Sequence, residues 1–431
     1  MNLFQQMLVA GASVSLLAPI AAQASDVVNL EEMNSYVRST KNQSSRIDSN
    51  TFINKVSEDI AILKGRVDGL EAKQNNFEAG SFSDTTTLDG KVVMGLMGTD
   101  HSKVKAGADD GIDSLSAAYQ YTMNLNTSFT GDDNLYVRLR TGNSAGNFVD
   151  KEFGTYLTMG TAYSDALKVD KIWYTFPVGE KNTFWVGPKI ENYYMHGTTP
   201  SIYKPVTKQF TLGGNGEAYG ASTDTGAGWA YKADNGFAVS SNIGTKSTTT
   251  TSGTNTGLLT NESKTSWATQ VGLTKPQWSA SVLVNQKYNG WGDDYYHSLQ
   301  HAPSSSNGNF SSVGLRGWWR PLETGSATPS VSLGYDSTTY DGAPAASDSS
   351  DAWFAGLMWQ DTFQADDKIG VAFGQPTTNE DETTDPFAYE LYYSYMLNDS
   401  VSVTPTVFGG TDRSGTSGGD VFGALVQTTF K

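Results

Sequence analysis

Charged side chains recur on one face of several segments in which polar and apolar residues alternate. In one of them, Arg138 and Arg140 alternate with the apolar residues Val137 and Leu139. Successive side chains of a β-strand point to opposite faces, so this spacing places both arginines on a face that meets water. Charged groups along a water-filled passage influence which ions pass through it. We therefore predict a pore lined by six charged residues, Arg138, Arg140, Lys232, Lys287, Arg316 and Glu390.

The distribution of charge predicts a weak preference for anions inside such a pore. Charge within the predicted strands is mostly basic, whereas the net charge of −16 comes largely from acidic residues in loops and turns. Opposite signs on wall and rim can set selectivity through their local fields. The alternative, equally open, is that inward Arg and Lys residues pair with acids of loops folded into the lumen. Lys171 is not assigned to a face, because both registers of its strand carry charge.

The longest gap between predicted strands, from Glu191 to Gly226, mixes aromatic and charged side chains. Such a loop would narrow the passage if it folded inward, and its aromatic rings could stack on sugars. We predict a constriction formed by Glu191, Tyr193, Tyr194, His196, Tyr203, Lys204 and Lys208. An ordinary surface loop with exposed tyrosines would have the same composition, so that alternative stays open.

Residue patterns typical of catalysis are weak. The four histidines, at positions 101, 196, 297 and 301, have no paired nucleophile or carboxylate at a suggestive spacing. His297 and His301 are four residues apart, but no helix or cysteine ligand is predicted beside them, so we expect no metal. The GGNG sequence at Gly213 lacks the Lys-Ser/Thr of a phosphate-binding loop. We predict no enzyme, no cofactor and, with a pI near 4.6, no nucleic-acid partner.

Sixteen short segments of alternating polarity between Leu88 and Phe430 would position the charged groups. The clearest of them runs from Leu115 to Phe129, and the gaps between segments are long and short in turn. Tight turns on one side, long loops on the other and an even strand number are typical of membrane barrels. No amphipathic helix is available to cover the apolar face of a soluble sheet. We therefore predict an all-β fold, a 16-stranded antiparallel transmembrane β-barrel over residues 88–430, with its apolar face in lipid.

Aromatic residues at the predicted strand ends would form the two interfacial girdles of such a barrel. After residue 25, no apolar run approaches the roughly 18 residues that a spanning helix needs. The alternative is that the tryptophans fill the core of a soluble sandwich. The predicted girdle residues include Trp173, Trp185, Trp229, Tyr231, Trp353, Trp359, Tyr389 and Phe430.

The first 80 residues differ from the barrel. Residues 1–24 read as a signal peptide, with an apolar stretch that ends near Ala22-Gln23-Ala24, and residues 25–46 as a linker. Residues 47–80 repeat apolar positions at spacings of three and four, the pattern of a coiled-coil helix. Its core residues favour association of two chains, although the helix could instead pack against or plug its own barrel. The predicted oligomerisation residues are Ile53, Val56, Ile60, Leu63, Val67 and Leu70.

The order of signal, heptad segment and barrel, with DKIWYTFPVGEKNTFWVGP from Asp170 to Pro188, resembles the cyanobacterial outer-membrane porins. These are related to the carbohydrate-selective porin family. The resemblance implies a passive channel, usually oligomeric, for inorganic ions and small hydrophilic solutes, and some members are iron-uptake porins. Many members carry a surface-layer-homology domain after the signal, for which Ser25 to Arg46 is too short. Attachment to the cell wall therefore stays open.

The predicted function is an outer-membrane porin with its N-terminal segment in the periplasm. Its expected partners are outer-membrane lipid, further copies of itself in a homotrimer, and small hydrophilic solutes, possible sugars among them, together with ions. The alternatives are a channel specific for a carbohydrate or iron, a plugged barrel with a structural or adhesive role and, more remotely, a barrel-embedded lipase.

Overall fold

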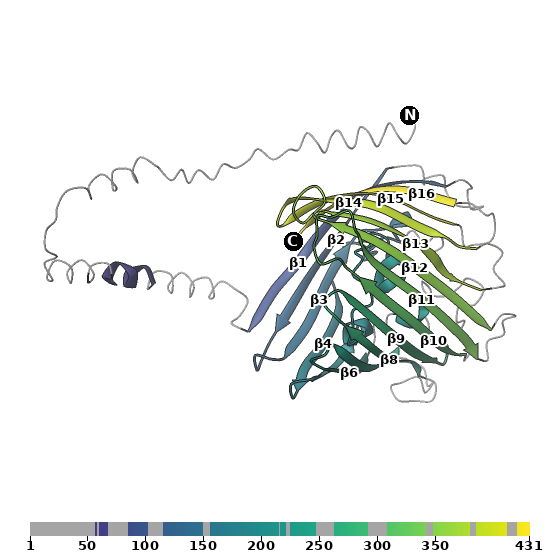
Figure 1. The fold of residues 1–431 in the computed structure, drawn as a ribbon, viewed down its shortest axis with the longest axis horizontal. Coiled ribbons are helices and arrows are strands. Elements are labelled where there is room, and N and C mark those ends of the chain that lie inside the picture. Colours follow the sequence, from purple (N-terminus) through teal and green to yellow (C-terminus); the bar gives the residue numbers. More distant parts are fainter. Residues whose placement is uncertain are drawn as a thin grey trace. The chain divides into compact units, whose positions relative to one another are not determined.

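Sixteen strands close into an antiparallel barrel in the computed structural model of the chain (Figure 1). The structure describes residues 57, 60–67, 85–101, 115–149, 156–214, 216–220, 225–246, 263–291, 308–341, 348–379, 385–411 and 420–431. Each strand pairs with its neighbours in sequence, and β1 pairs with β16 to close the ring. The predicted all-β barrel of sixteen antiparallel strands is confirmed.

The strands have similar lengths, apart from the 16-residue β1 and three short ones, β3, β5 and β6. Their bounds are β1 Thr86–His101, β2 Ser116–Thr127, β3 Asn134–Gly142, β4 Lys168–Val178, β5 Asn182–Lys189, β6 Thr225–Lys232, β7 Phe237–Lys246, β8 Lys264–Thr274, β9 Trp278–Tyr288, β10 Asn309–Trp319, β11 Ser330–Asp341, β12 Ser349–Gln360, β13 Lys368–Thr378, β14 Ala388–Asn398, β15 Val401–Thr411 and β16 Asp420–Phe430. A short 3-10 helix, η2 Gly146–Val149, lies between β3 and β4.

Polarity across the barrel wall is the reverse of that in a soluble protein. Along β9 the side chains alternate between exposed and buried, and the apolar Val282 and Val284 are exposed while Asn285 and Lys287 are buried. The same alternation runs along β10 and β11. An apolar outer face and a polar inner face match a barrel whose outside is solvated by hydrocarbon.

Asp133 closes the short turn between β2 and β3. Its Oδ1 accepts hydrogen bonds from the hydroxyl of Ser128 at 2.8 Å and from the backbone N–H groups of Phe129 at 2.9 Å and Thr130 at 2.8 Å. Its Oδ2 accepts a hydrogen bond from the hydroxyl of Tyr174 on β4 at 2.6 Å. We call this arrangement the turn clasp, since one carboxylate joins a turn to the neighbouring strand.

A second turn clasp lies between β12 and β13. The carboxylate of Asp367 accepts hydrogen bonds from the backbone N–H groups of Thr362, Phe363 and Gln364 at 2.7 to 3.2 Å. The hydroxyl of Tyr393 on β14 donates to it at 3.0 Å. The two turns share the sequence Ser/Thr-Phe-x-x-Asp-Asp. In both, the last Asp accepts hydrogen bonds from the N–H groups of the Phe and of the residue after it, whereas the first residue donates through its hydroxyl at Ser128 and through its backbone N–H group at Thr362.

A bulge in β4 decides which way its charged residues point. Arg138 on β3 pairs with Lys171, and Leu139 pairs with Val169, so Asp170 is an extra residue in the ladder. A bulge changes the phase of alternation, and both Asp170 and Lys171 are buried on the inner side. Lys171 could not be assigned to a face from the sequence. Unbroken alternation would place the adjacent Asp170 and Lys171 on opposite faces, whereas the bulge turns both side chains inward.

The same change of phase corrects the prediction for Trp173. We expected its side chain in an outer girdle, but it is 4% exposed and lies inside the barrel. Its ring packs against Tyr136 with centroids 4.4 Å apart and against Tyr194 with centroids 5.3 Å apart. The prediction for Trp173 was wrong because this residue lies in the middle of β4, not at its end, and follows the bulge on the inward face.

The N-terminal segment, Met1–Asp84, forms a unit separate from the barrel unit Thr85–Lys431. Residues 60–67 are helical, and Ile60, Leu63 and Val67 are all exposed on this helix. The other predicted oligomerisation residues, Ile53, Val56 and Leu70, lie outside the described residues, as do the signal peptide and the linker. Among the described residues, no helix combines the length and the apolar character needed to cross a bilayer. The coiled coil stays a prediction.

Candidate functional site

The long segment between β5 and β6 folds into the barrel. We call residues 190–220 the inner loop; it contains the 3-10 helices η3 Asn192–Met195, η4 Lys208–Gly213 and η5 Glu217–Tyr219. The N–H group of Thr198 donates to Gln270 on β8 at 2.9 Å, and the N–H group of Ile202 donates to Ser332 on β11 at 3.2 Å. Because these partners face inward from separate strands, the loop crosses the interior of the barrel.

The first attachment of the inner loop is a network of charges, which we call the charged anchor. The guanidinium of Arg138 donates from Nε to Asp170 at 2.6 Å and from Nη2 to Glu191, at the start of the loop, at 2.7 Å. Arg140 and Lys171 lie 3.5 Å and 3.3 Å from Asp170. Burial would raise the pKa of Glu191, but the charges of Arg138 and Lys171 outweigh it and hold that pKa below its ordinary value. Glu191 therefore stays ionised and bound to the wall.

The second attachment uses a carboxylate without a cation, and we call it the carboxylate cradle. Glu390 on β14 accepts hydrogen bonds from the hydroxyl of Tyr203 at 2.8 Å and the N–H group of Val206 at 3.2 Å. It also accepts hydrogen bonds from the N–H group and hydroxyl of Thr207, at 2.7 and 2.6 Å. None of the ion pairs among the described residues includes Glu390. Four neutral donors of the inner loop thus satisfy one buried carboxylate of the wall.

The third attachment is made by Arg316 on β10. Its Nη2 bonds to Asp336 on β11 at 2.7 Å, and its Nε donates to the carbonyl of Leu212 at 2.8 Å. The guanidinium also lies over the ring of Tyr219, 4.4 Å from its centroid, a favourable cation–π geometry. One arginine therefore links two strands of the wall to both η4 and η5 of the inner loop.

Backbone approaches backbone beside Arg316. A Cβ atom at Gly334 on β11 would lie 1.8 Å from the carbonyl oxygen of Gly213, so a side chain is excluded there. Gly213 and Gly214 both have positive φ, a conformation that glycine adopts without strain. Gly213 and Gly214 therefore form a turn that lies against the wall.

Lys287 on β9 contributes a fourth attachment. Its Nζ donates to the carbonyl oxygen of Glu217 at the start of η5. The same ammonium group lies 5.0 Å from the ring centroid of Trp291, which is fully buried. Beside it, Asn285 donates to the carbonyl of Ala218 at 3.1 Å. Polar side chains of β9 thus donate hydrogen bonds to two backbone carbonyls of η5.

Apolar side chains fill the space between the inner loop and one side of the wall. Tyr203 and Phe210 of the loop pack on Phe354 of β12, with ring centroids 5.8 and 5.7 Å apart. This cluster was not predicted from the sequence, because strict alternation implies a uniformly polar inner face. Its signal was present as large apolar residues at inward positions of β12, β15 and β16. The inward members of the cluster include Val93, Met97, Phe354, Met358, Tyr392, Phe408 and Leu425.

The structure places the six residues predicted to line the pore on the inner side, but in two different settings. Arg138, Lys287, Arg316 and Glu390 are only 5%, 1%, 4% and 1% exposed, since the inner loop covers them. They hold the loop and are not open to water, which corrects their expected setting. Arg140 is partly exposed and Lys232 is exposed. These two can still face a passage.

The residues predicted to form a constriction divide in the same way. Glu191 and Tyr203 attach the inner loop, whereas Tyr194, which is 47% exposed, and Lys204 contact solvent. Tyr193 is partly buried and packs on Tyr194, with ring centroids 4.9 Å apart. The remaining two, His196 and Lys208, lie along the buried side of the loop: His196 is buried and Lys208 is half-buried.

Burial lowers the pKa of His196 to about 3, so its ring is neutral at physiological pH. The ring makes an edge contact with Tyr219, with centroids 5.4 Å apart, and its Nδ1 is 3.5 Å from the side-chain nitrogen of Asn242. These surroundings are those of a packed side chain. Within the described residues, no group of three or more His, Cys, Asp or Glu could hold a metal ion. His297 and His301 lie outside the described residues.

Comparisons with known proteins agree on one architecture. The model of the carbohydrate-selective porin, OprB family, matches residues 47–409. The uncharacterized protein alr4550 of Nostoc sp. (strain PCC 7120) is 25% identical over 425 residues, which cover 87% of this chain and 70% of that protein.

Two solved porins have a similar fold. OprB of Pseudomonas putida, in its high-pH structure, has a TM-score of 0.54 at 12% identity, covering 80% of this chain and 94% of its own. The anion-selective porin from Comamonas acidovorans has a TM-score of 0.53 at 10% identity, covering 80% of this chain and 99% of its own.

Proposed function

The chain belongs to the carbohydrate-selective porin family and is an outer-membrane porin for small solutes, and from this premise we propose that it conducts inorganic ions and small hydrophilic solutes by passive diffusion past the inner loop. Porins of this fold are channels and not enzymes. The observation that supports the proposal most strongly is the reversed polarity of the wall, apolar outside and polar inside, with one long loop attached across the interior. Such a loop narrows a barrel without closing it.

We propose that solutes pass beside the charged anchor. Apart from the charged anchor, the inner loop is attached by buried contacts to strands between β7 and β14, whereas Arg140 on β3 and Lys91 on β1 keep exposed or partly exposed side chains. Lys91 lies within electrostatic range of both Arg138 and Arg140. On this part of the wall the cations Lys91, Arg138, Arg140 and Lys171 outnumber the carboxylates Asp89, Asp170 and Glu191. This balance supports a weak preference for anions.

Deleting Asn192–Tyr203 tests the role of the inner loop. The deletion removes η3 and the Tyr203 contact to Glu390, so we expect single-channel conductance to rise and larger sugars to enter in liposome swelling. The matched control is deletion of the exposed turn residue Glu323, which lies far from the inner loop in sequence. Unchanged conductance after the first deletion would remove the constriction role.

We also propose that the N-terminal segment lies in the periplasm and joins copies of the chain. The exposed apolar side chains of Ile60, Leu63 and Val67 on the helix at residues 60–67 support this, because a lone helix would leave them in water. Whether two or three chains associate is read from the mass of the detergent-solubilised particle by light scattering. A single-chain mass would contradict the proposal.

A further inference from the structure

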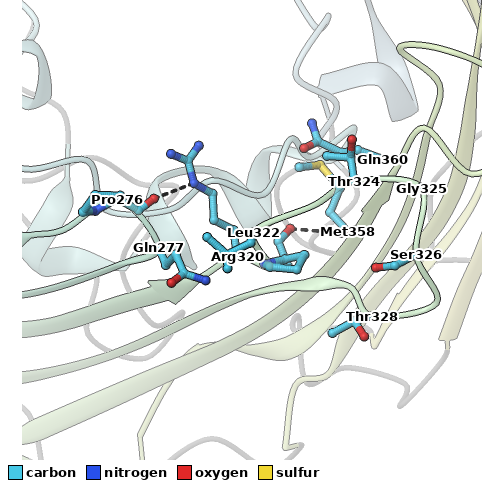
Figure 2. Close-up of a pocket in the computed structure, with 12 residues that line it drawn as sticks. Pro276, Gln277, Arg320, Leu322, Thr324, Gly325, Ser326, Thr328, Met358 and Gln360 are labelled. Carbon is cyan, nitrogen blue, oxygen red and sulfur yellow. Dashed lines mark hydrogen bonds between the residues drawn. The ribbon is translucent and has the colours of Figure 1, made fainter.

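A cavity of about 230 Å³ lies at the end of the barrel that carries the short turns, away from the charged anchor (Figure 2). It is enclosed by the turn between β8 and β9, the turn between β10 and β11, and the end of β12. Figure 2 shows Arg320, Gln277 and Gln360 around it, with Leu322 between them. At about 30 Å³ per water molecule, the cavity would hold roughly seven or eight waters, or one small organic solute.

The cavity reaches the inner side of the wall, while its turn residues Arg320 and Leu322 are exposed. Ser330 and Met358 line it and are buried, whereas their neighbours Val331 and Trp359 face the outer side of the sheet. Just above it in β10, the indole of the inward residue Trp318 donates to the inner loop. A solute that had passed the inner loop would therefore meet this cavity before it left the barrel.

Arg320 distinguishes this cavity from the other arginine sites of the barrel. In the described part of the barrel, Arg138, Arg140 and Arg316 each have a carboxylate partner. Arg320 has none there: its Nε donates to the carbonyl of Pro276 at 2.7 Å, and it lies beside the ring of Trp318. Figure 2 shows its two terminal nitrogens directed away from Pro276. Both remain available to an anionic ligand.

The remaining lining fits the body of an organic acid. Ser326 and Thr328 carry hydroxyl groups, and Leu322 and Met358 offer apolar contact. Nearby, the carboxylate of Asp361 is already held by the N–H group of Asp366 at 2.6 Å. A guanidinium presents paired donors that match the two oxygens of a carboxylate.

We propose that this cavity is a binding site for small organic carboxylates on their way out of the pore, with Arg320 as the residue that binds the carboxylate. The proposal rests on the proposed function as a channel, and it adds a solute class to it. The long loops lie on one side of the contact between Trp318 and the inner loop, and the site lies on the other side. A solute that enters past the long loops therefore reaches the site after the constriction. A bound carboxylate in this position transiently obstructs the ionic current.

The test uses the full mature chain in planar bilayers at about 0.1 M KCl, where charge pairing is only partly screened. Sodium lactate, added on the short-turn side, is expected to produce blocking events, and lactamide, its neutral counterpart, is not. Arg320→Gln is expected to raise the half-blocking lactate concentration at least about tenfold, the loss of one charge-assisted hydrogen bond. Arg320→Lys keeps the charge without the paired donors and is expected to fall between the two.

Lys181→Gln is the matched control, because Lys181 is a cation on the same end of the barrel that is already paired with Asp234. Its half-blocking concentration is expected to equal that of the unaltered chain. Equal block by lactate in Arg320→Gln, or equal block by lactamide, would overturn the site while leaving the channel intact. A chain that passes no current contradicts the channel itself. Saturation-transfer NMR then measures lactate binding to the detergent-solubilised protein and to its Arg320→Lys variant, which tests the site separately from conduction.

Discussion

The inner loop is attached at its start and at its middle by two carboxylates with opposite surroundings. Glu191 belongs to the loop and meets Arg138 of the wall, in a network that Arg140 links to solvent. Glu390 belongs to the wall and meets only neutral donors of the loop, among apolar side chains. One attachment pairs charges, and the other surrounds a single charge with hydrogen bonds.

The difference between the two attachments indicates which side of the barrel interior we expect to contact water. Paired charges tolerate water, since their attraction is weakened but each ion remains solvated. A lone buried carboxylate requires all its donors to stay in place, because each lost donor leaves it less compensated. We therefore expect the carboxylate cradle on a dry side where the loop is fixed, and the contrast supports the proposed passage beside the charged anchor, where Arg140 is partly exposed.

Glu390→Ala is expected to have the largest effect. It removes the acceptor of four hydrogen bonds and leaves the donors of Tyr203, Val206 and Thr207 buried without it. We expect the loop attachment to lose roughly 3 kcal/mol or more, with higher and noisier single-channel conductance. Glu390→Gln, which keeps one acceptor oxygen, should show a smaller change. Unaltered conductance and unaltered current noise in Glu390→Ala would contradict this difference between the two attachments.

Arg138→Gln is expected to have an intermediate effect on structure and a clear effect on selectivity. Lys171 and Arg140 remain near Asp170, so we expect a loss of about 1–3 kcal/mol at this attachment. Loss of the guanidinium charge should move the reversal potential across a KCl gradient toward cation preference. Arg140→Gln removes the same charge without breaking the contact to Glu191. If the reversal potential shifted equally in both variants and their conductance were the same, selectivity would depend on the charge alone and not on the contact to Glu191.

The strand pattern was predictable from the sequence, and the phase of β4 was not. Alternation identifies strands wherever one face meets lipid, as in β9 and β10. The bulge at Asp170 inserts one residue without a sequence signature, so Lys171 had no assigned face and Trp173 was placed on the wrong one. Asp170 at the bulge is held by Arg138, 32 residues away in sequence, and by Tyr163, seven residues away.

The partners of the inner loop were also beyond the sequence. Composition led us to predict Glu191 and Tyr203 in an inward-folding loop, but nothing local indicates that Tyr203 contacts Glu390, 187 residues away. The apolar inner cluster was missed for a related reason. Large residues such as Phe354 and Phe408 lie on the face that alternation assigns to water, and only the inner loop explains them. The predicted roles in conduction remain predictions.

Asp133→Asn is expected to have the smallest effect, and it sharpens the comparison by testing a carboxylate with neutral donors outside the lumen. The hydroxyl of Tyr174 and the N–H groups of the turn hold the pKa of Asp133 well below its usual range. The folded chain then binds fewer protons than the unfolded chain. The carboxylate's contribution to stability is therefore complete above the unfolded pKa of about 3.9 and is lost as pH falls below it.

Thermal unfolding followed by electrophoretic mobility between pH 7 and pH 3 measures this contribution. Asp133→Asn should be less stable at pH 7, and the difference from the unaltered chain should shrink toward pH 3, with unchanged conductance throughout. Asp367→Asn, in the second turn clasp, should behave in the same direction. A difference that persists undiminished at pH 3 would contradict the assignment to the carboxylate.

The seam between β1 and β16 has a consequence for assembly kinetics. It joins the first strand to the last, from Val92 opposite Phe430 to His101 opposite Val421. Bringing such distant segments together is entropically slow, so the nascent sheet exists for a time with two unpaired borders. Unpaired borders accept any suitable strand, including one from a neighbouring molecule. A high local concentration of incompletely folded chains therefore favours aggregation through these unpaired strands. Closure of the seam is the step that an assembly factor would accelerate most.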